Sequence, residues 1–187
     1  MSYPTVLKAT TLIRLAIVSD AQDAEVFLTG EVEVDETYFG GRRKGKRGRG
    51  AFNKTPVFGI LERDGVVKVN VVHDVSAESL LNMTIKTVRR GSIVYTDKFR
   101  SYDSLMFCGY RHLRVDHGKR FAMGKVYING LEGFWSYAKE RIIKFHGVSK
   151  EKFPLYLKEM EFRYNNRQRN LFNLLVQKIC NLVPDLL

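Results

Sequence analysis

The feature that most constrains this fold is a pair of β-rich runs separated by a short turn. Residues 56–62 and 66–72 are rich in Val, Ile and Phe, and an Arg-Asp-Gly sequence at 63–65 lies between them. An Asp-Gly turn between two such runs indicates a β-hairpin. Residues 30–38 alternate valines with acidic residues, which predicts a further strand before the hairpin. Together these segments predict a three-strand antiparallel meander.

After the meander, the chain alternates between helical and extended patterns. In order, the patterns predict a helix at 76–89, a strand at 92–97, a helical segment at 99–107, a strand at 110–115, and helices at 130–145, 153–164 and 171–182. A meander followed by this alternation predicts an α/β fold, in which helices flank a mixed sheet of antiparallel and parallel strands.

The charge balance indicates a polyanionic partner. The 187 residues include 31 Lys and Arg against 20 Asp and Glu, a net charge of +11. Nucleic acid fits best, because Lys and Arg contacts to phosphate release counterions and dominate affinity. The segment 40–53 is a glycine-rich loop without acidic residues, and it is the main candidate for DNA contact. Its basic residues are Arg42, Arg43, Lys44, Lys46, Arg47 and Arg49.

Other partners and locations are less consistent with the sequence. No apolar run is long enough to cross a bilayer, so no membrane partner is expected and a cytoplasmic location follows. Cys108 and Cys180 are too far apart in sequence to indicate a zinc site, and two cysteines do not make a disulfide framework.

Acidic residues are concentrated in the first strand of this basic chain. Glu31, Glu33 and Asp35 alternate and share one face, and Glu36 follows them. An inward carboxylate would cost several kcal/mol unless it were paired or bound to a cation. The alternative is that residues 30–38 form an edge strand with solvated charges.

Two further acids lie where they could converge with Asp35. Asp97 ends the 92–97 strand, and Glu132 lies in the first turn of the helix that follows Asn129. Each could instead be a helix cap: Asp97 as an N-cap, and Glu132 in a capping box with Asn129. If the first and fourth strands are neighbours, the three carboxylates can share a hard divalent cation such as Mg²⁺.

These segments resemble the motifs of a known protein family. Residues 30–41 with the basic run 42–50, residues 94–102, and residues 128–135 with Lys139 occur in the order and spacing of three family motifs. The family is that of bacterial insertion-sequence transposases of the DDE type, with an integrase-like, ISXO-like transposase domain. The resemblance covers about residues 30–170.

The resemblance implies a ribonuclease-H-like fold and metal-dependent phosphodiester cleavage and strand transfer at insertion-sequence ends. It implies that Asp35, Asp97 and Glu132 are catalytic and hold two Mg²⁺ ions, for which Mn²⁺ can substitute. Asn129 is an alternative third ligand, and Lys139 is expected to contact phosphate. The implied partners are double-stranded DNA, as terminal inverted repeats and target, and further copies of the chain assembled on DNA in the bacterial nucleoid.

The resemblance also suggests how the chain is organised. Residues 1–29 are expected to be a helical segment and a candidate remnant of a helix-turn-helix, truncated at its N-terminus, and residues 30–187 the catalytic domain with its C-terminal helices. Because relatives commonly carry His where this chain has Tyr127, a non-catalytic DNA-binding remnant is an alternative. A structural nucleic-acid-binding protein of ribosomal type is another, although it leaves the acidic strand unexplained.

Overall fold

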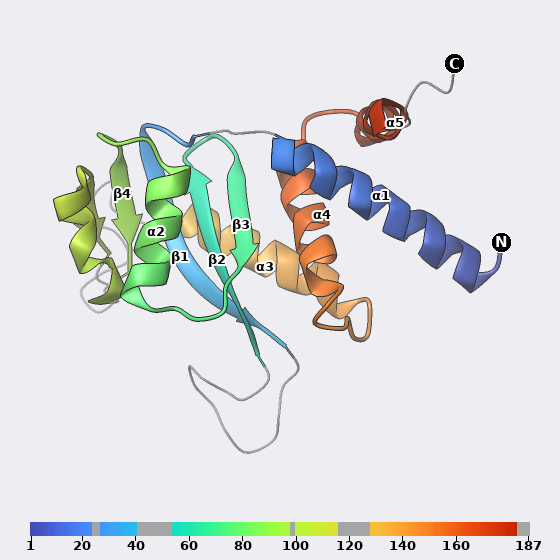
Figure 1. The fold of residues 1–187 in the computed structure, drawn as a ribbon, viewed down its shortest axis with the longest axis horizontal. Coiled ribbons are helices and arrows are strands. Elements are labelled where there is room, and N and C mark those ends of the chain that lie inside the picture. Colours follow the sequence, from blue (N-terminus) through green and yellow to red (C-terminus); the bar gives the residue numbers. More distant parts are fainter. Residues whose placement is uncertain (24–26, 41–53, 98–99, 116–127, 183–187) are drawn as a thin grey trace.

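The structure, a computed structural model, describes residues 1–23, 27–40, 54–97, 100–115 and 128–182. Its sheet has the strand order β3-β2-β1-β4-β5 (Figure 1). The strands are β1 (Glu31–Phe39), β2 (Thr55–Glu62), β3 (Val67–Val71), β4 (Ile93–Thr96) and β5 (Arg111–Arg114). The first three pair antiparallel, whereas β4 is parallel to β1 and β5 is parallel to β4. This topology confirms the predicted mixed sheet of ribonuclease-H-like type.

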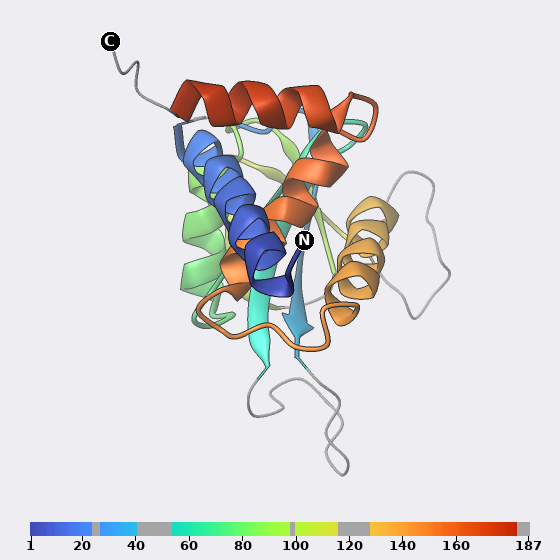
Figure 2. The same cartoon turned by 90° about the vertical axis from the view of Figure 1, so that its right-hand side faces the viewer.

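Helices cover both faces of the sheet. They are α1 (Tyr3–Asp23), α2 (Ala77–Thr87), the 3-10 helix η1 (Arg100–Cys108), α3 (Asn129–Ile143), α4 (Phe153–Asn165) and α5 (Leu171–Leu182). Helix α2 lies on one face, and α3 and α4 lie on the other (Figure 1). Helix α5 lies across the ends of α1 and α4 (Figure 2). None of the described helices is long and apolar enough to cross a membrane.

The alternation of side chains along each strand divides the interior into two main cores. The core beneath α2 contains Val32, Val34, Phe58, Ile60, Leu80 and Val94. The core beneath α3 and α4 contains Phe39, Val57, Leu61, Leu131, Phe134 and Trp135. Odd-numbered residues of β1 therefore face α3, and its buried valines face α2. This alternation places Asp35 on the α3 side of the sheet.

The acidic strand β1 is not an edge strand, so that interpretation of its charges was wrong. It pairs with β2 on one side and β4 on the other, and Glu33 is only 1% exposed. Arg63 balances the acids: its Nη1 lies 2.7 Å from Glu31 Oε2 and its Nε lies 3.3 Å from Glu33 Oε1. Tyr95 adds a hydrogen bond from its hydroxyl to Glu31 at 2.9 Å. Internal pairing, rather than solvation, makes these charges tolerable.

Helix α4 covers the open edge of β3. Asn165 accepts a hydrogen bond from the backbone N–H of Val67 and donates one to the carbonyl of the same residue, at 2.8 and 2.9 Å. Glu161 accepts the N–H of Val69 at 2.8 Å. These side chains take the place of a further strand and so protect an edge that could otherwise pair with another chain.

Helix α1 packs against α4 through a buried ion pair. Arg14 Nε lies 2.7 Å from Glu159 Oε2, and the two side chains are only 6% and 10% exposed. The guanidinium also lies 3.7 Å from the ring centre of Tyr156. Ala16 and Ile17 are buried on the same helix. The helix-turn-helix origin of residues 1–29 stays a prediction, but this helix is braced by α4.

Candidate active site at the centre of the sheet

The structure places Asp35 and Asp97 side by side on adjacent parallel strands. β1 and β4 pair in a register that joins Glu33 to Tyr95, and Asp97 follows directly after β4. Two residues further along both strands, the same register places Asp97 beside Asp35. The negative charge of Asp97 acts on the Asp35 carboxyl group. Two of the three predicted acidic residues are therefore brought together.

The Asp35 carboxyl group lies in surroundings that disfavour its charge. Burial, followed by the charges of Glu36 and Asp97, raises the pKa of Asp35 to about 7. Hydrogen bonds from the Trp135 indole and the Glu36 backbone oppose this rise. A carboxylate that is partly desolvated beside other acids is a favourable ligand for a cation, because the cation removes the repulsion.

Helix α3 lies parallel to β1 and is attached to it at three levels. Glu33 Oε2 accepts the backbone N–H of Leu131 at 2.8 Å, and Asp35 Oδ2 accepts the indole N–H of Trp135 at 3.1 Å. At the third level, Lys139 Nζ donates to Thr37 Oγ1 at 2.6 Å. Two residues of a strand advance by ~6.6 Å and four residues of a helix by ~6 Å. Every second residue of β1 can therefore meet every fourth residue of α3.

Glu33 performs the capping role that the sequence suggested for Asn129 and Glu132. The helix begins at Asn129, and its N-cap is Ile128, which makes no side-chain cap bond, so Asn129 is not the N-cap that the alternative capping box needs. The buried Glu33 carboxylate instead accepts backbone N–H groups from the first turn. Burial raises the pKa of Glu33, although these N–H groups and Arg63 lower it. A negative group at this end also favours the helix dipole.

Gly130 allows α3 to begin so close to the sheet. A Cβ at this position would lie 2.5 Å from Leu61 Cδ2 and 3.0 Å from Glu33 Oε2. Any side chain would therefore displace either the core or the carboxylate that caps the helix. The close approach fixes where the first turn of α3, including Glu132, lies relative to β1.

Asp35 and Asp97 carry ligand atoms of the kind that a divalent cation such as Mg²⁺ prefers. The two aspartates offer oxygen ligands on one face of the sheet, and Mg²⁺ is commonly held by one or two carboxylates together with substrate phosphates. Within the described ranges, no three Asp, Glu, His or Cys side chains form a group that could hold a metal ion. The assignment of Glu132, or alternatively Asn129, as a third ligand stays a prediction.

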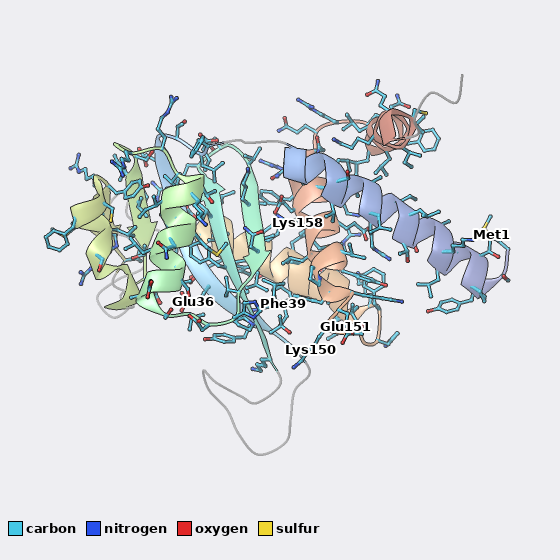
Figure 3. All side chains as sticks on the ribbon, in the orientation of Figure 1. Met1, Glu36, Phe39, Lys150, Glu151 and Lys158 are labelled. Carbon is cyan, nitrogen blue, oxygen red and sulfur yellow. The ribbon has the colours of Figure 1, made fainter. Side chains whose placement is uncertain are left out.

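Lys139 brings a positive charge near Asp35. Partial burial lowers the pKa of Lys139, while the charge of Asp35 raises it and that of Lys54 lowers it. Lys54 immediately precedes β2, whose first residue pairs with Phe39, and Lys139 bonds to Thr37. Both lysines therefore lie towards the end of β1 at which Figure 3 labels Phe39. A phosphate contact by Lys139 stays a prediction.

Several predicted residues lie outside the described part of the chain. These are Arg42, Arg43, Lys44, Lys46, Arg47, Arg49 and Tyr127. The first six belong to the segment that links β1 to β2, and Phe39 and Thr55 pair at the last described level of that hairpin. Their proposed contacts with DNA are neither supported nor contradicted by the structure.

Sequence reasoning missed the parts that Glu33 and Trp135 play around Asp35. Glu33 shares a face with Asp35 in the strand pattern, which was the available signal for a paired buried acid. Trp135 is a core residue that is 4% exposed, and its bond to Asp35 joins residues 100 positions apart. No local pattern contains such a pairing.

The chain belongs to the family of the ISXO2-like transposase domain, whose sequence profile matches residues 27–165. A relative from Haemophilus influenzae, described as an uncharacterized transposase-like protein, is 47% identical over 98 residues, which are 52% of this chain and 80% of that protein. A relative from Halobacterium salinarum, described as an uncharacterized protein in transposable element ISH50, is 30% identical over 154 residues. That match covers 73% of this chain and 52% of that protein.

Two solved structures are similar at low identity. The crystal structure of the Mos1 strand transfer complex has a TM-score of 0.42 and 15% identity, covering 92% of this chain and 57% of that chain. The Mos1 transposase paired-end complex with left transposon end has a TM-score of 0.37 and 12% identity, covering 97% and 63%. The chain thus spans about half the length of the Halobacterium relative and under two thirds of each Mos1 chain.

Proposed function

We propose that this chain is a DNA transposase that cleaves phosphodiester bonds and transfers DNA strands at insertion-sequence ends. The observation that carries the proposal is the placement of Asp35 and Asp97 at one level of adjacent parallel strands, in a chain of a transposase family. Both aspartates stand in segments that resemble the acidic motifs of that family. The raised pKa of Asp35 gives the pair a physical reason to bind a cation.

The chemistry of the proposal needs metal ions that these residues would hold. Two Mg²⁺ ions, or Mn²⁺ in their place, would activate an attacking hydroxyl and stabilise the leaving oxygen. Asp35 and Asp97 supply anionic oxygens, and Glu132 on the first turn of α3 is the proposed third ligand. Lys139 is proposed to hold a DNA phosphate beside them, because its ammonium lies close enough for Asp35 to affect its pKa.

The proposed partner is double-stranded DNA, both the terminal repeats and the target. The net charge of +11 and the basic residues between positions 42 and 49 favour a polyanion. Assembly of several copies on DNA is part of the same proposal. The chain's own contribution would be to align the DNA with the carboxylates, since a misplaced phosphate loses most of the rate advantage.

Cleavage of DNA that carries insertion-sequence ends tests the proposal. The Asp35→Asn and Asp97→Asn variants should lose Mg²⁺-dependent cleavage while keeping DNA binding and the fold. Glu140→Gln is the matched control, because Glu140 is an exposed acid on α3 that pairs with Lys144. Full cleavage by either Asn variant would reject that residue. DNA binding without cleavage by the unmodified chain would favour a non-catalytic DNA-binding remnant.

A further inference from the structure

We propose that Trp135 is the positioning residue for Asp35, and that Gly59 provides the space that it needs. Trp135 is the only tryptophan of the chain, and its indole N–H donates to Asp35 Oδ2 at 3.1 Å. It would act through Asp35 and not on DNA directly. The inference rests on the proposed function, because the orientation of Asp35 matters for activity only if this carboxylate holds a metal ion.

The indole is held rigidly enough to orient a carboxylate. It is buried between Phe39, whose ring centre lies 6.2 Å away in an edge contact, and Phe134, at 5.2 Å. Both rings belong to the core beneath α3 and α4. A donor fixed in this way restricts rotation of the Asp35 carboxylate, and pre-set ligand orientation is what a metal site requires.

Gly59 lies on the strand beside Asp35 and leaves room for the indole. The two residues are partners in the β1–β2 register. A Cβ on Gly59 would lie 2.5 Å from Trp135 Cζ2 and 2.7 Å from Cη2, so any side chain there would displace the ring. Gly59 is not among the residues with positive φ, which means that space and not backbone conformation accounts for the glycine. The space beside Gly59 and the hydrogen bond to Asp35 are two separate features that both fix the position of the Trp135 indole.

The chemistry of the donor suits a metal ligand. An indole N–H is a neutral donor, so it can orient the carboxylate without neutralising its charge. A Lys or Arg in the same place would compete with a bound cation for that charge. Trp135 therefore leaves Asp35 available as an anionic ligand beside Asp97.

A double-mutant cycle on Mn²⁺ binding tests the proposal, with affinity measured by isothermal titration calorimetry. Trp135→Phe keeps a ring but removes the donor, and it should weaken Mn²⁺ binding by about 10- to 100-fold, as loss of a ligand's hydrogen-bond partner does. Gly59→Ala should give a loss of similar size by displacing the indole. The double variant should be no worse than Trp135→Phe alone, because Phe has neither Cζ2 nor Cη2 for the new methyl group to meet.

Gly133 provides a control on the same helix as Trp135. Gly133→Ala adds a methyl group to α3 at a point where no atom of the described residues lies within 4 Å, and it should leave Mn²⁺ affinity unchanged. Unchanged affinity in Trp135→Phe, or losses that add in the double variant, would overturn the role of Trp135 while leaving the metal site of the proposed function intact. No Mn²⁺ binding by the unmodified protein would instead reject the metal site itself.

Fluorescence provides a second readout that needs no change at Trp135 or Gly59. The single tryptophan touches the proposed ligand, so Mn²⁺ or Mg²⁺ should change its emission in the unmodified protein. The change should be lost in Asp35→Asn, which keeps the ring but loses the anionic ligand. If calorimetry shows that the ion binds but the tryptophan emission does not change, the proposal is contradicted. This result does not depend on whether Gly59→Ala folds.

Discussion

Glu33 on β1 accepts a hydrogen bond from the backbone N–H of Leu131 at 2.8 Å, across 98 residues of sequence. This contact fixes the start of α3, and hence Glu132, relative to the strand that carries Asp35. The same carboxylate pairs with Arg63. One buried side chain therefore connects the sheet, the β2–β3 turn and the helix around the candidate site.

Replacing Glu33 with Ala should destabilise the fold by about 3 kcal/mol, because it leaves buried N–H groups without an acceptor and removes a partner of Arg63. Glu33→Gln keeps an oxygen acceptor and should cost about 1 kcal/mol. The free energy of unfolding can be measured in urea by circular dichroism. Equal losses in the two variants would show that the charge, and not the cap, dominates.

The raised pKa of Asp35 predicts a pH-dependent stability in the absence of divalent ions. Between its ordinary 3.8 and about 7, this group binds more protons in the folded than in the unfolded chain. The free energy of unfolding should therefore fall as pH rises through this window, by no more than about 4 kcal/mol from this group. Because Asn does not titrate, Asp35→Asn should gain stability relative to the unmodified protein from pH 4 to pH 7. If the free energies of unfolding of the two proteins, measured in EDTA, change in parallel with pH, the raised pKa of Asp35 is contradicted.

The ion pair between Arg14 and Glu159 should be needed for α1 to pack on α4. In Arg14→Met, the buried Glu159 carboxylate keeps one ion pair among the described residues, with Arg163. The substitution should lower the free energy of unfolding by about 3 kcal/mol. Lys144→Met is the control, because Lys144 forms an exposed pair with Glu140 and should cost nothing measurable. Thermal unfolding compares the two variants. Equal stability would mean that the contact with Arg14 does not hold α1.

The basic residues between 42 and 49 should set the salt dependence of DNA binding. Each phosphate contact contributes about −0.9 to the slope of log affinity against log salt on duplex DNA. The slope should flatten when six residues are changed to Gln: Arg42, Arg43, Lys44, Lys46, Arg47 and Arg49. It should be preserved when only the arginines are changed, to Lys, because the positive charges remain. A slope that survives all six Gln substitutions would exclude contact between this segment and phosphate.

Local patterns were sufficient to predict much of the fold. The Asp-Gly turn and the alternating valines predicted the meander, and apolar spacing placed α2, α3, α4 and α5 close to their observed bounds. The segment at 99–107 was expected to be helical and forms a 3-10 helix over Arg100–Cys108. Whether so short a segment forms a 3-10 helix or an α-helix depends on packing that the sequence pattern does not specify.

The candidate site was predictable only where its residues stand in motifs. Asp35 and Asp97 could be named because each belongs to a recognisable segment, and strand pairing then brings them together. The bonds from Trp135 to Asp35 and from Leu131 to Glu33 depend instead on how α3 lies along β1. That register arises from tertiary packing, so a local pattern could not distinguish a core tryptophan from one that also orients a carboxylate.

Asp35 and Asp97 are proposed to hold a divalent cation together, and diffraction from crystals grown with Mn²⁺ and a DNA duplex tests this most directly. Anomalous scattering locates the ion independently of any assumption about activity. We expect a peak within bonding distance of oxygens from both aspartates, with Glu132 as the third protein ligand. Crystals that contain bound DNA but show no Mn²⁺ peak at Asp35 and Asp97 would contradict the claim.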